Sequence, residues 1–144
     1  MSSNKMSTIH LKAHHVGISI ANMQEAIAWY QQNLDFEFCW EKDFPEIKTK
    51  IAFLQHGDFK LELFEHYETE AMPEARKHPL TDMRQQGTKH ICYEVESGLT
   101  ALFERFKNTG VDIVMGPLLS PPKDAMMGFI RDNTGNLIEI IELL

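Results

Sequence analysis

Two segments of this chain share one pattern, an apolar strand with a glutamate near its centre. One runs from Phe59 to Glu65 around Glu62, and the other runs from Leu137 to Leu143 around Glu139. Side chains alternate between the two faces of a strand, so Glu139 shares its face with apolar residues only. A carboxylate in such a place is costly unless it is paired, bound to a metal, or open to water at the mouth of a cup. The pattern therefore predicts an internal repeat built around a polar centre.

The repeat extends over most of the chain. Each half reads as a strand, a helix and three further strands, and each first strand begins with a histidine, His15 or His90. The spacing from histidine to glutamate is 47 residues from His15 to Glu62 and 49 from His90 to Glu139. The apolar residues after His15, not those after His14, match the register that follows His90. We therefore predict an α+β fold made of tandem βαβββ modules that form a cupped, half-barrel mixed sheet.

Local signals place the two helices. Asn22 is the expected N-cap of a helix that runs to about Asn33, and Ser97 is the expected N-cap of a helix that runs to about Thr109. Gly110 suits the position just after the second helix. A turn or mobile loop is expected around Asp43 to Pro45.

The predicted domain organisation follows from the repeat. A flexible N-terminal tail covers residues 1–10, and residues 11–144 form a single domain. Within it, module one covers residues 11–65, a connector covers residues 66–87, and module two covers residues 88–144. Pro73 and Pro79 interrupt the connector, in which we expect a helical turn near residues 73–77.

Composition and charge restrict the kinds of molecule that the chain is expected to bind. The 144 residues carry a formal net charge of −7, which argues against a general nucleic-acid or anionic-membrane surface. Cys39 and Cys92 form no CxxC pair, so a reduced setting without a disulfide is expected. Residues 1–8 are polar and contain no apolar stretch typical of a signal peptide, and no run approaches the roughly 20 apolar residues of a membrane span. We predict a cytoplasmic protein with a small-molecule substrate and no nucleic-acid or membrane partner.

Convergence of the two modules would bring His15, Glu62, His90 and Glu139 to one centre. Two imidazoles and two carboxylates suit one divalent ion, and the pattern does not distinguish Ni, Co, Zn, Mn and Fe. Without thiolate ligands, an open, catalytic site is favoured over a structural zinc site. Taken singly, a strand histidine or glutamate is more often a solvated or satisfied residue. Their equivalent positions in two repeats favour the ligand interpretation.

From about residue 11 to 144 the chain resembles the vicinal oxygen chelate superfamily, which includes glyoxalases, bleomycin-resistance proteins and dioxygenases. The segments that carry the resemblance are His15-Val16-Gly17-Ile18, Leu61-Glu62-Leu63, His90-Ile91 and Gly135-Asn136-Leu137-Ile138-Glu139. The resemblance implies a divalent metal held by His15, Glu62, His90 and Glu139. It also implies a lyase or isomerase that stabilises an enediolate or enolate of a small carbonyl substrate chelated to the metal. Glu139 is the expected general base, with Glu62 as the alternate.

An acid at position 62 resembles the lactoylglutathione lyase and methylmalonyl-CoA epimerase branch. The lyase usually has Arg four residues after the first histidine, where this chain has Ser19. Two alternatives remain open. One is an Fe(II)-dependent dioxygenase with His15, His90 and Glu139 as its ligands. The other is a metal-free protein that binds small molecules such as drugs.

Further residues are expected around the centre. The candidates for a substrate-binding wall are Phe64, Cys92, Phe129 and, on a proline-rich loop, Lys123. Phe38, Trp40 and Phe53 are further candidates on strand faces. Half-barrels leave sheet edges and apolar faces to cover, so we expect a homodimer. Whether the metal site lies within one chain or is shared by two is left open.

Overall fold

The secondary structure follows the predicted order through both halves. The computed structural model describes residues 9–144. The first half contains β1 (His15–Ser19), α1 (Met23–Leu34), β2 (Glu37–Phe44), the 3-10 turn η1 (Pro45–Ile47), β3 (Thr49–His56) and β4 (Phe59–His66). The connector contains η2 (Glu74–Lys77) and α2 (Pro79–Asp82). The second half contains β5 (Ile91–Glu94), α3 (Leu99–Thr109), β6 (Asp112–Leu119), β7 (Ala125–Arg131) and β8 (Leu137–Leu143).

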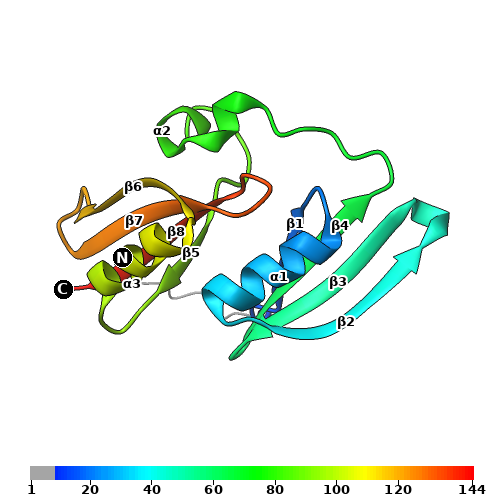
Figure 1. The fold of residues 1–144 in the computed structure, drawn as a ribbon, viewed down its shortest axis with the longest axis horizontal. Coiled ribbons are helices and arrows are strands. Elements are labelled where there is room, and N and C mark those ends of the chain that lie inside the picture. Colours follow the sequence, from blue (N-terminus) through cyan, green and yellow to red (C-terminus); the bar gives the residue numbers. More distant parts are fainter. Residues whose placement is uncertain (1–8) are drawn as a thin grey trace.

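The strands form two mixed sheets with the same topology. Their orders are β1-β4-β3-β2 and β5-β8-β7-β6 (Figure 1). In each sheet the outermost pair, β1 with β4 or β5 with β8, is parallel, and the other neighbours are antiparallel. This repetition confirms the tandem βαβββ architecture and the α+β class. The parallel pairing also places His15, the first residue of β1, and His90, immediately before β5, beside the strand that carries the candidate glutamate.

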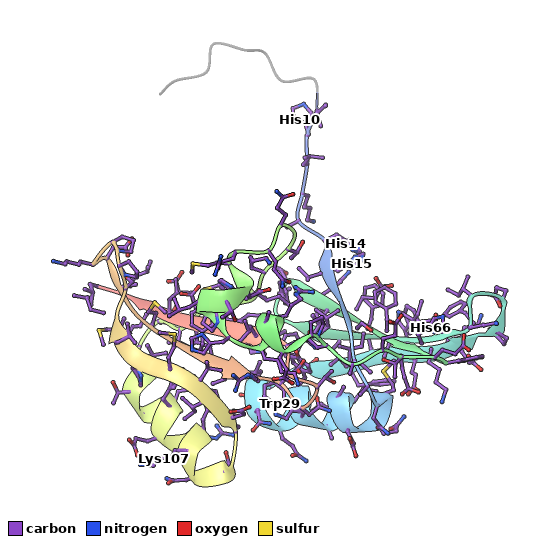
Figure 2. The ribbon with its side chains drawn as sticks, turned by 90° about the horizontal axis from the view of Figure 1, so that it is seen from above. His10, His14, His15, Trp29, His66 and Lys107 are labelled. Atoms are coloured by element: carbon purple, nitrogen blue, oxygen red, sulfur yellow. The ribbon has the colours of Figure 1, made fainter. Side chains whose placement is uncertain are left out.

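Helices cover one face of the sheets and leave the other face to the candidate ligands. Leu61 and Leu63 are fully buried towards the helices, whereas Glu62 between them points to the opposite face. Figure 2 shows the two sides: Trp29 on α1 lies below the sheets, and His15 and His66 lie above them. Burial of each large apolar side chain contributes about 1.5–3 kcal/mol, so strand alternation determines which face carries the polar residues.

The start of each helix is tied to the strand that carries the candidate glutamate. A carboxylate oxygen of Glu65 accepts a hydrogen bond from the backbone N–H of Met23, the first residue of α1. In the same way, Glu142 accepts from the N–H of Leu99, the first residue of α3, at 2.8 Å. These donors have no partner within the helix, and a carboxylate also interacts favourably with the helix N-terminus. Glu65 lies three residues after Glu62, and Glu142 lies three residues after Glu139, so each helix-capping glutamate points to the opposite face of the strand from the candidate ligand.

One local prediction is wrong, and another is displaced by one or two residues. Ser97 was expected to cap the second helix, but Gly98 occupies that position with a φ of 81° and no side-chain bond, and Glu142 serves the helix instead. The turn or mobile loop expected around Asp43 to Pro45 forms slightly later, because β2 continues to Phe44, which pairs with Thr49 of β3, and the 3-10 turn η1 joins the two strands from Pro45. By contrast, Asn22 caps α1 as predicted and accepts from Glu25 N–H at 2.9 Å.

A buried carboxylate joins the two halves. Asp132, 4% exposed, accepts three backbone N–H bonds at 2.9 Å each through Oδ1, within the turn that leads to β8. Its Oδ2 accepts from the hydroxyl of Tyr30 on α1 at 2.7 Å. The rings of Phe36 and Tyr93 also meet across the halves, with centroids 6.1 Å apart. One apolar core contains residues of both halves, so their relative position is set by buried contacts.

Some predictions remain as they were. The tail predicted over residues 1–10 falls mainly on residues 1–8, which lie outside the described residues. The boundaries at residues 65 and 88 stay predictions. Between residues 9 and 144, no helix has the length and apolar character needed to cross a membrane.

Replacing Tyr30 with Phe is expected to lower the free energy of unfolding by about 1–2 kcal/mol, because Asp132 loses one buried donor. Burial, and then the charge of Asp132, raises the pKa of Tyr30 well above its ordinary value of 10. The unfolded chain therefore loses this proton at a lower pH than the folded chain, and stability falls as pH rises above about 10. Urea unfolding at neutral pH and at about pH 11 should show a weaker fall for Tyr30→Phe than for the wild type.

The matched control is Tyr67→Phe. The Tyr67 hydroxyl also donates to a carboxylate, Asp43 Oδ1 at 2.6 Å, but at an exposed position. Its loss should change stability by less than about 0.5 kcal/mol. Equal losses in the two variants at neutral pH would contradict the importance given to the Tyr30 bond.

Candidate metal centre

The first candidate pair is formed by β1 and β4. His15 Nε2 lies 3.2 Å from Glu62 Oε1. The His15 ring stands edge-on to Phe53 of β3, with centroids 5.1 Å apart and planes at 70°. Gly17 pairs with Glu62 across the parallel ladder, and a Cβ at position 17 would come within 2.8 Å of the Phe64 ring. Glycine at this position therefore lets Phe64 lie against β1 beside the pair.

The second pair repeats the first on β5 and β8. His90, immediately before β5, places Nε2 3.2 Å from Glu139 Oε1. Its ring stands edge-on to Phe129 of β7, with centroids 4.9 Å apart and planes at 84°. Phe129 is buried, so it forms a dry wall behind the histidine. Each half of the chain thus builds a histidine, a carboxylate and an aromatic ring in the same arrangement.

The donor atoms of each pair have a spacing that suits adjacent ligands of one metal ion. Two ligand atoms at about 2.1 Å from a metal and at right angles are about 3.0 Å from each other. The carboxylates are 18% and 19% exposed, and the histidines 35% and 30%, so both pairs remain open on one side. A direct hydrogen bond between imidazole and carboxylate has a similar distance. Two imidazoles and two carboxylates would suit one divalent metal ion if the two pairs met.

Within a single chain, the pair His15–Glu62 and the pair His90–Glu139 do not come together to form one site. Among residues 9–144, no three His, Cys, Asp or Glu side chains are placed so that they could hold one metal ion. His15 lies beside Glu62, and His90 lies beside Glu139. We call the first pair the first half-site and the second pair the second half-site. The buried contacts of Tyr30 and Asp132 hold the halves in this relation.

The predicted wall residues lie in different surroundings. Phe64 and Phe129 line the first and second half-sites as described above. Trp40 stacks on Phe53, with centroids 5.1 Å apart and planes at 27°, so an aromatic surface continues from His15 towards β2. Phe38 lies just before a bulge in β2 and is 47% exposed. Lys123 lies in the exposed turn between β6 and β7 with a φ of 64°, and its part in binding stays a prediction.

Cys92 lies beside Glu139 in the second half-site, because these two residues pair across the β5–β8 ladder. Partial burial, and then the charge of Glu139, raises the pKa of the Cys92 thiol to about 12. The thiol therefore keeps its proton at neutral pH. It is a hydrogen-bond donor at this position rather than a nucleophile or a thiolate ligand.

His14 was not expected near the site, yet its Nδ1 lies 2.7 Å from Nδ1 of His15. The register that follows His90 matches the one that follows His15, and strand alternation would direct His14 to the opposite face. The strand begins only at His15, so alternation does not constrain the residue before it. The only sequence feature that could have indicated this contact is that His14 and His15 are adjacent.

A cleft of about 970 Å³ borders the second half-site. It lies along β1 and the start of β5, beneath the connector, and His90 lines one side. Its cationic side chains already have carboxylate partners: Arg76 and Lys89 bond to buried Asp82, and Lys77 bonds to Glu74. The cleft therefore offers little unpaired positive charge for an anionic group.

Known proteins resemble the chain in sequence and in fold. The family model described as "Glyoxalase/Bleomycin resistance protein/Dioxygenase superfamily" matches residues 12–140. An ethylmalonyl-CoA/methylmalonyl-CoA epimerase of Cereibacter sphaeroides is 31% identical, over 72% of this chain and 74% of its own. A lactoylglutathione lyase of Neisseria meningitidis serogroup A is 27% identical, over 89% and 88%. A glyoxalase family protein of Enterococcus faecalis has the same fold, with a TM-score of 0.77 at 24% identity, over 91% and 97%.

The contact between Cys92 and Glu139 can be tested by thiol labelling in a Cys39→Ser background with a metal chelator present. Cys92 should react slowly at about pH 9, since its pKa is about 12. Glu139→Gln removes the nearby negative charge, lowers the thiol pKa and should speed labelling several-fold. Glu94→Gln, which removes the exposed carboxylate at the end of β5, should have a smaller effect, because the charge of Glu139 raises the pKa of the Cys92 thiol more than the charge of Glu94 does. Equal rates in the wild type and Glu139→Gln would contradict this geometry.

Proposed function

The chain belongs to the Glyoxalase/Bleomycin resistance protein/Dioxygenase superfamily, and we propose that it is a metal-dependent lyase or isomerase that acts on a small carbonyl compound. The observation that carries this proposal is the repeated pair of histidine and glutamate. Each pair has donor atoms 3.2 Å apart and stands beside an aromatic ring, at equivalent positions of the two modules.

The equal geometry of the pairs supports a four-ligand centre. An iron oxygenase with His15, His90 and Glu139 as ligands would leave Glu62 without a role. Glu62 instead faces His15 as Glu139 faces His90. The similarity to a lactoylglutathione lyase and to an acyl-CoA epimerase supports the same choice. The proposed ligands are therefore His15, Glu62, His90 and Glu139, with one divalent ion per site.

When bound, such an ion acts as a Lewis acid that polarises a substrate carbonyl and favours loss of the proton on the adjacent carbon. Glu139 is the proposed general base, which accepts that proton and returns it to the substrate. Cys92 remains protonated beside Glu139, so it can donate a hydrogen bond to the carboxylate and orient it. The rings of Phe53 and Phe129 cover one side of His15 and His90, respectively.

A second copy of the chain is proposed to complete the centre. Both half-sites lie on the side of the sheets away from α1 and α3, because the neighbours of Glu62 and Glu139 along β4 and β8 are buried in the core shared with these helices. The buried Tyr30–Asp132 bond opposes closure of the two half-sites within one chain. In a symmetric pair, module one of each copy can face module two of the other, so that two four-ligand sites form. Large side chains left exposed near the open faces, Trp40 and Leu143 among them, would then be covered.

The four-ligand centre predicts metal content. The purified, untagged protein should hold about one equivalent of divalent metal per chain, and Glu62→Ala should lose most of it. Removing one ligand weakens binding far more than removing an exposed carboxylate such as Glu37 on β2, so Glu37→Ala is the matched control. Elemental analysis of the three proteins decides the question. Retention of metal by Glu62→Ala would favour a three-ligand oxygenase, and absence of metal from the wild type would overturn the proposed function.

Sharing of the site by two chains predicts complementation between two inactive variants. One variant carries His15→Ala and Glu62→Ala, and the other carries His90→Ala and Glu139→Ala. Each alone should bind little metal. A mixed dimer, assembled by co-expression, regains one intact site from module one of one chain and module two of the other. It should hold about one metal ion per two chains, measured after separation by two different affinity tags. No recovery in an isolated mixed dimer would show that the site does not cross the chains.

A further inference from the structure

His14 and His15 meet at the base of the N-terminal arm, residues 9–14. Figure 2 shows the two residues next to each other, above the sheets and opposite Trp29. Their Nδ1 atoms are 2.7 Å apart, and their rings are nearly perpendicular, with centroids 5.0 Å apart and planes at 77°. Two ring nitrogens at this distance share one hydrogen, so one donates and the other accepts.

The contact with His14 matters because the other ring nitrogen of His15, Nε2, lies in the candidate site. His15 Nε2 faces Glu62 and is the proposed ligand atom. A neutral imidazole with a lone pair on Nε2 carries its hydrogen on Nδ1. The Nδ1–H of His15 then points at Nδ1 of His14, which accepts it while the His14 hydrogen occupies Nε2. Together with the Phe53 ring, this bond restricts the rotation of the His15 imidazole.

We propose that His14 is a positioning residue for His15, which selects the tautomer and the ring orientation that direct Nε2 into the centre. The proposal rests on the proposed function, since it assigns a partner to one of the four ligands. Histidine ligands commonly donate their second N–H to a carboxylate or carbonyl, and loss of that partner weakens metal binding about 10- to 100-fold. Here an imidazole takes that place.

The second half-site differs at this position. The residue before His90 is Lys89, whose ammonium group bonds to Asp82 and to the carbonyl oxygen of Gln85. Lys89 therefore fastens the connector and offers no acceptor to the histidine that follows it. The two ligand histidines consequently have different surroundings, and His90 is an internal reference for any effect of His14.

The test compares three variants of the full-length protein with the wild type by Co(II) titration, followed through the absorption of the bound ion. His14→Ala removes the acceptor and should raise the Kd for Co(II) about 10- to 100-fold. His14→Asn places an amide oxygen close to the position of Nδ1 and should restore affinity to within about threefold of the wild type. His10→Ala removes another exposed histidine of the same arm and should leave the affinity unchanged.

A second readout follows the hydrogen itself in the Zn(II)-loaded protein. With ¹⁵N-labelled histidine, the Nδ1–H signal of His15 should be visible and protected from exchange in the wild type and in His14→Asn. The signal should broaden or vanish in His14→Ala, while the signals of His90 stay in place. A general loss of structure would move both histidines.

The outcomes separate the two proposals. If the wild type binds neither ion, the proposed function fails and the assignment of His14 fails with it. If the wild type binds Co(II) but His14→Ala binds it equally well, only the assignment of His14 is overturned. Unchanged His15 signals in His14→Ala, or failure of His14→Asn to restore affinity, would also overturn it.

Discussion

The relative position of the two halves depends on the buried carboxylate of Asp132. An ionised group removed from water is costly, and here the cost is offset by backbone and side-chain donors that surround both oxygens. The contacts continue in both directions along the chain. Asp132 shapes the turn that leads into the Glu139 strand, and its partner Tyr30 lies on the helix whose start is fastened by Glu65. Since Glu65 lies three residues after Glu62, a continuous path of bonds links the two half-sites.

The two halves share a framework but differ in their open faces. In the first half, Trp40 and Phe53 form a stacked aromatic surface that is partly exposed beside His15. In the second half, Met127, Phe129 and Leu137 form a buried apolar cluster beside His90. In the proposed pairing of two chains, each centre lies between one aromatic wall and one tightly packed wall. A substrate would therefore meet different surroundings on its two sides.

The sequence was informative wherever side-chain alternation decides the outcome. It predicted the duplication, the strands, and the strand face that carries each of His15, Glu62 and Glu139, because burial of one strand face determines the register. It predicted that the four candidate ligands share one centre, whereas the described chain has two separate pairs, His15 with Glu62 and His90 with Glu139. It could not predict how far the sheet face of the first half lies from that of the second half. This separation depends on contacts such as the Tyr30–Asp132 hydrogen bond, whose residues are 102 apart in the chain. The four-residue helix α2 is too short to show a periodic pattern. Ser97 was a misleading N-cap signal, because the N–H of Leu99 at the start of α3 donates instead to Glu142, which lies on β8, 43 residues further along the chain.

The paired glutamates on β4 and β8 also bear on the ancestry of the fold. In both halves, one glutamate faces the centre and the other, three residues later, holds the start of the helix. Each half thus contains its own helix fastening and its own pair of polar side chains. A gene for one half would already encode a complete set of these local interactions, and only association between copies would be needed to assemble a larger unit. The two halves nevertheless differ in detail, since His14 precedes His15 and Lys89 precedes His90.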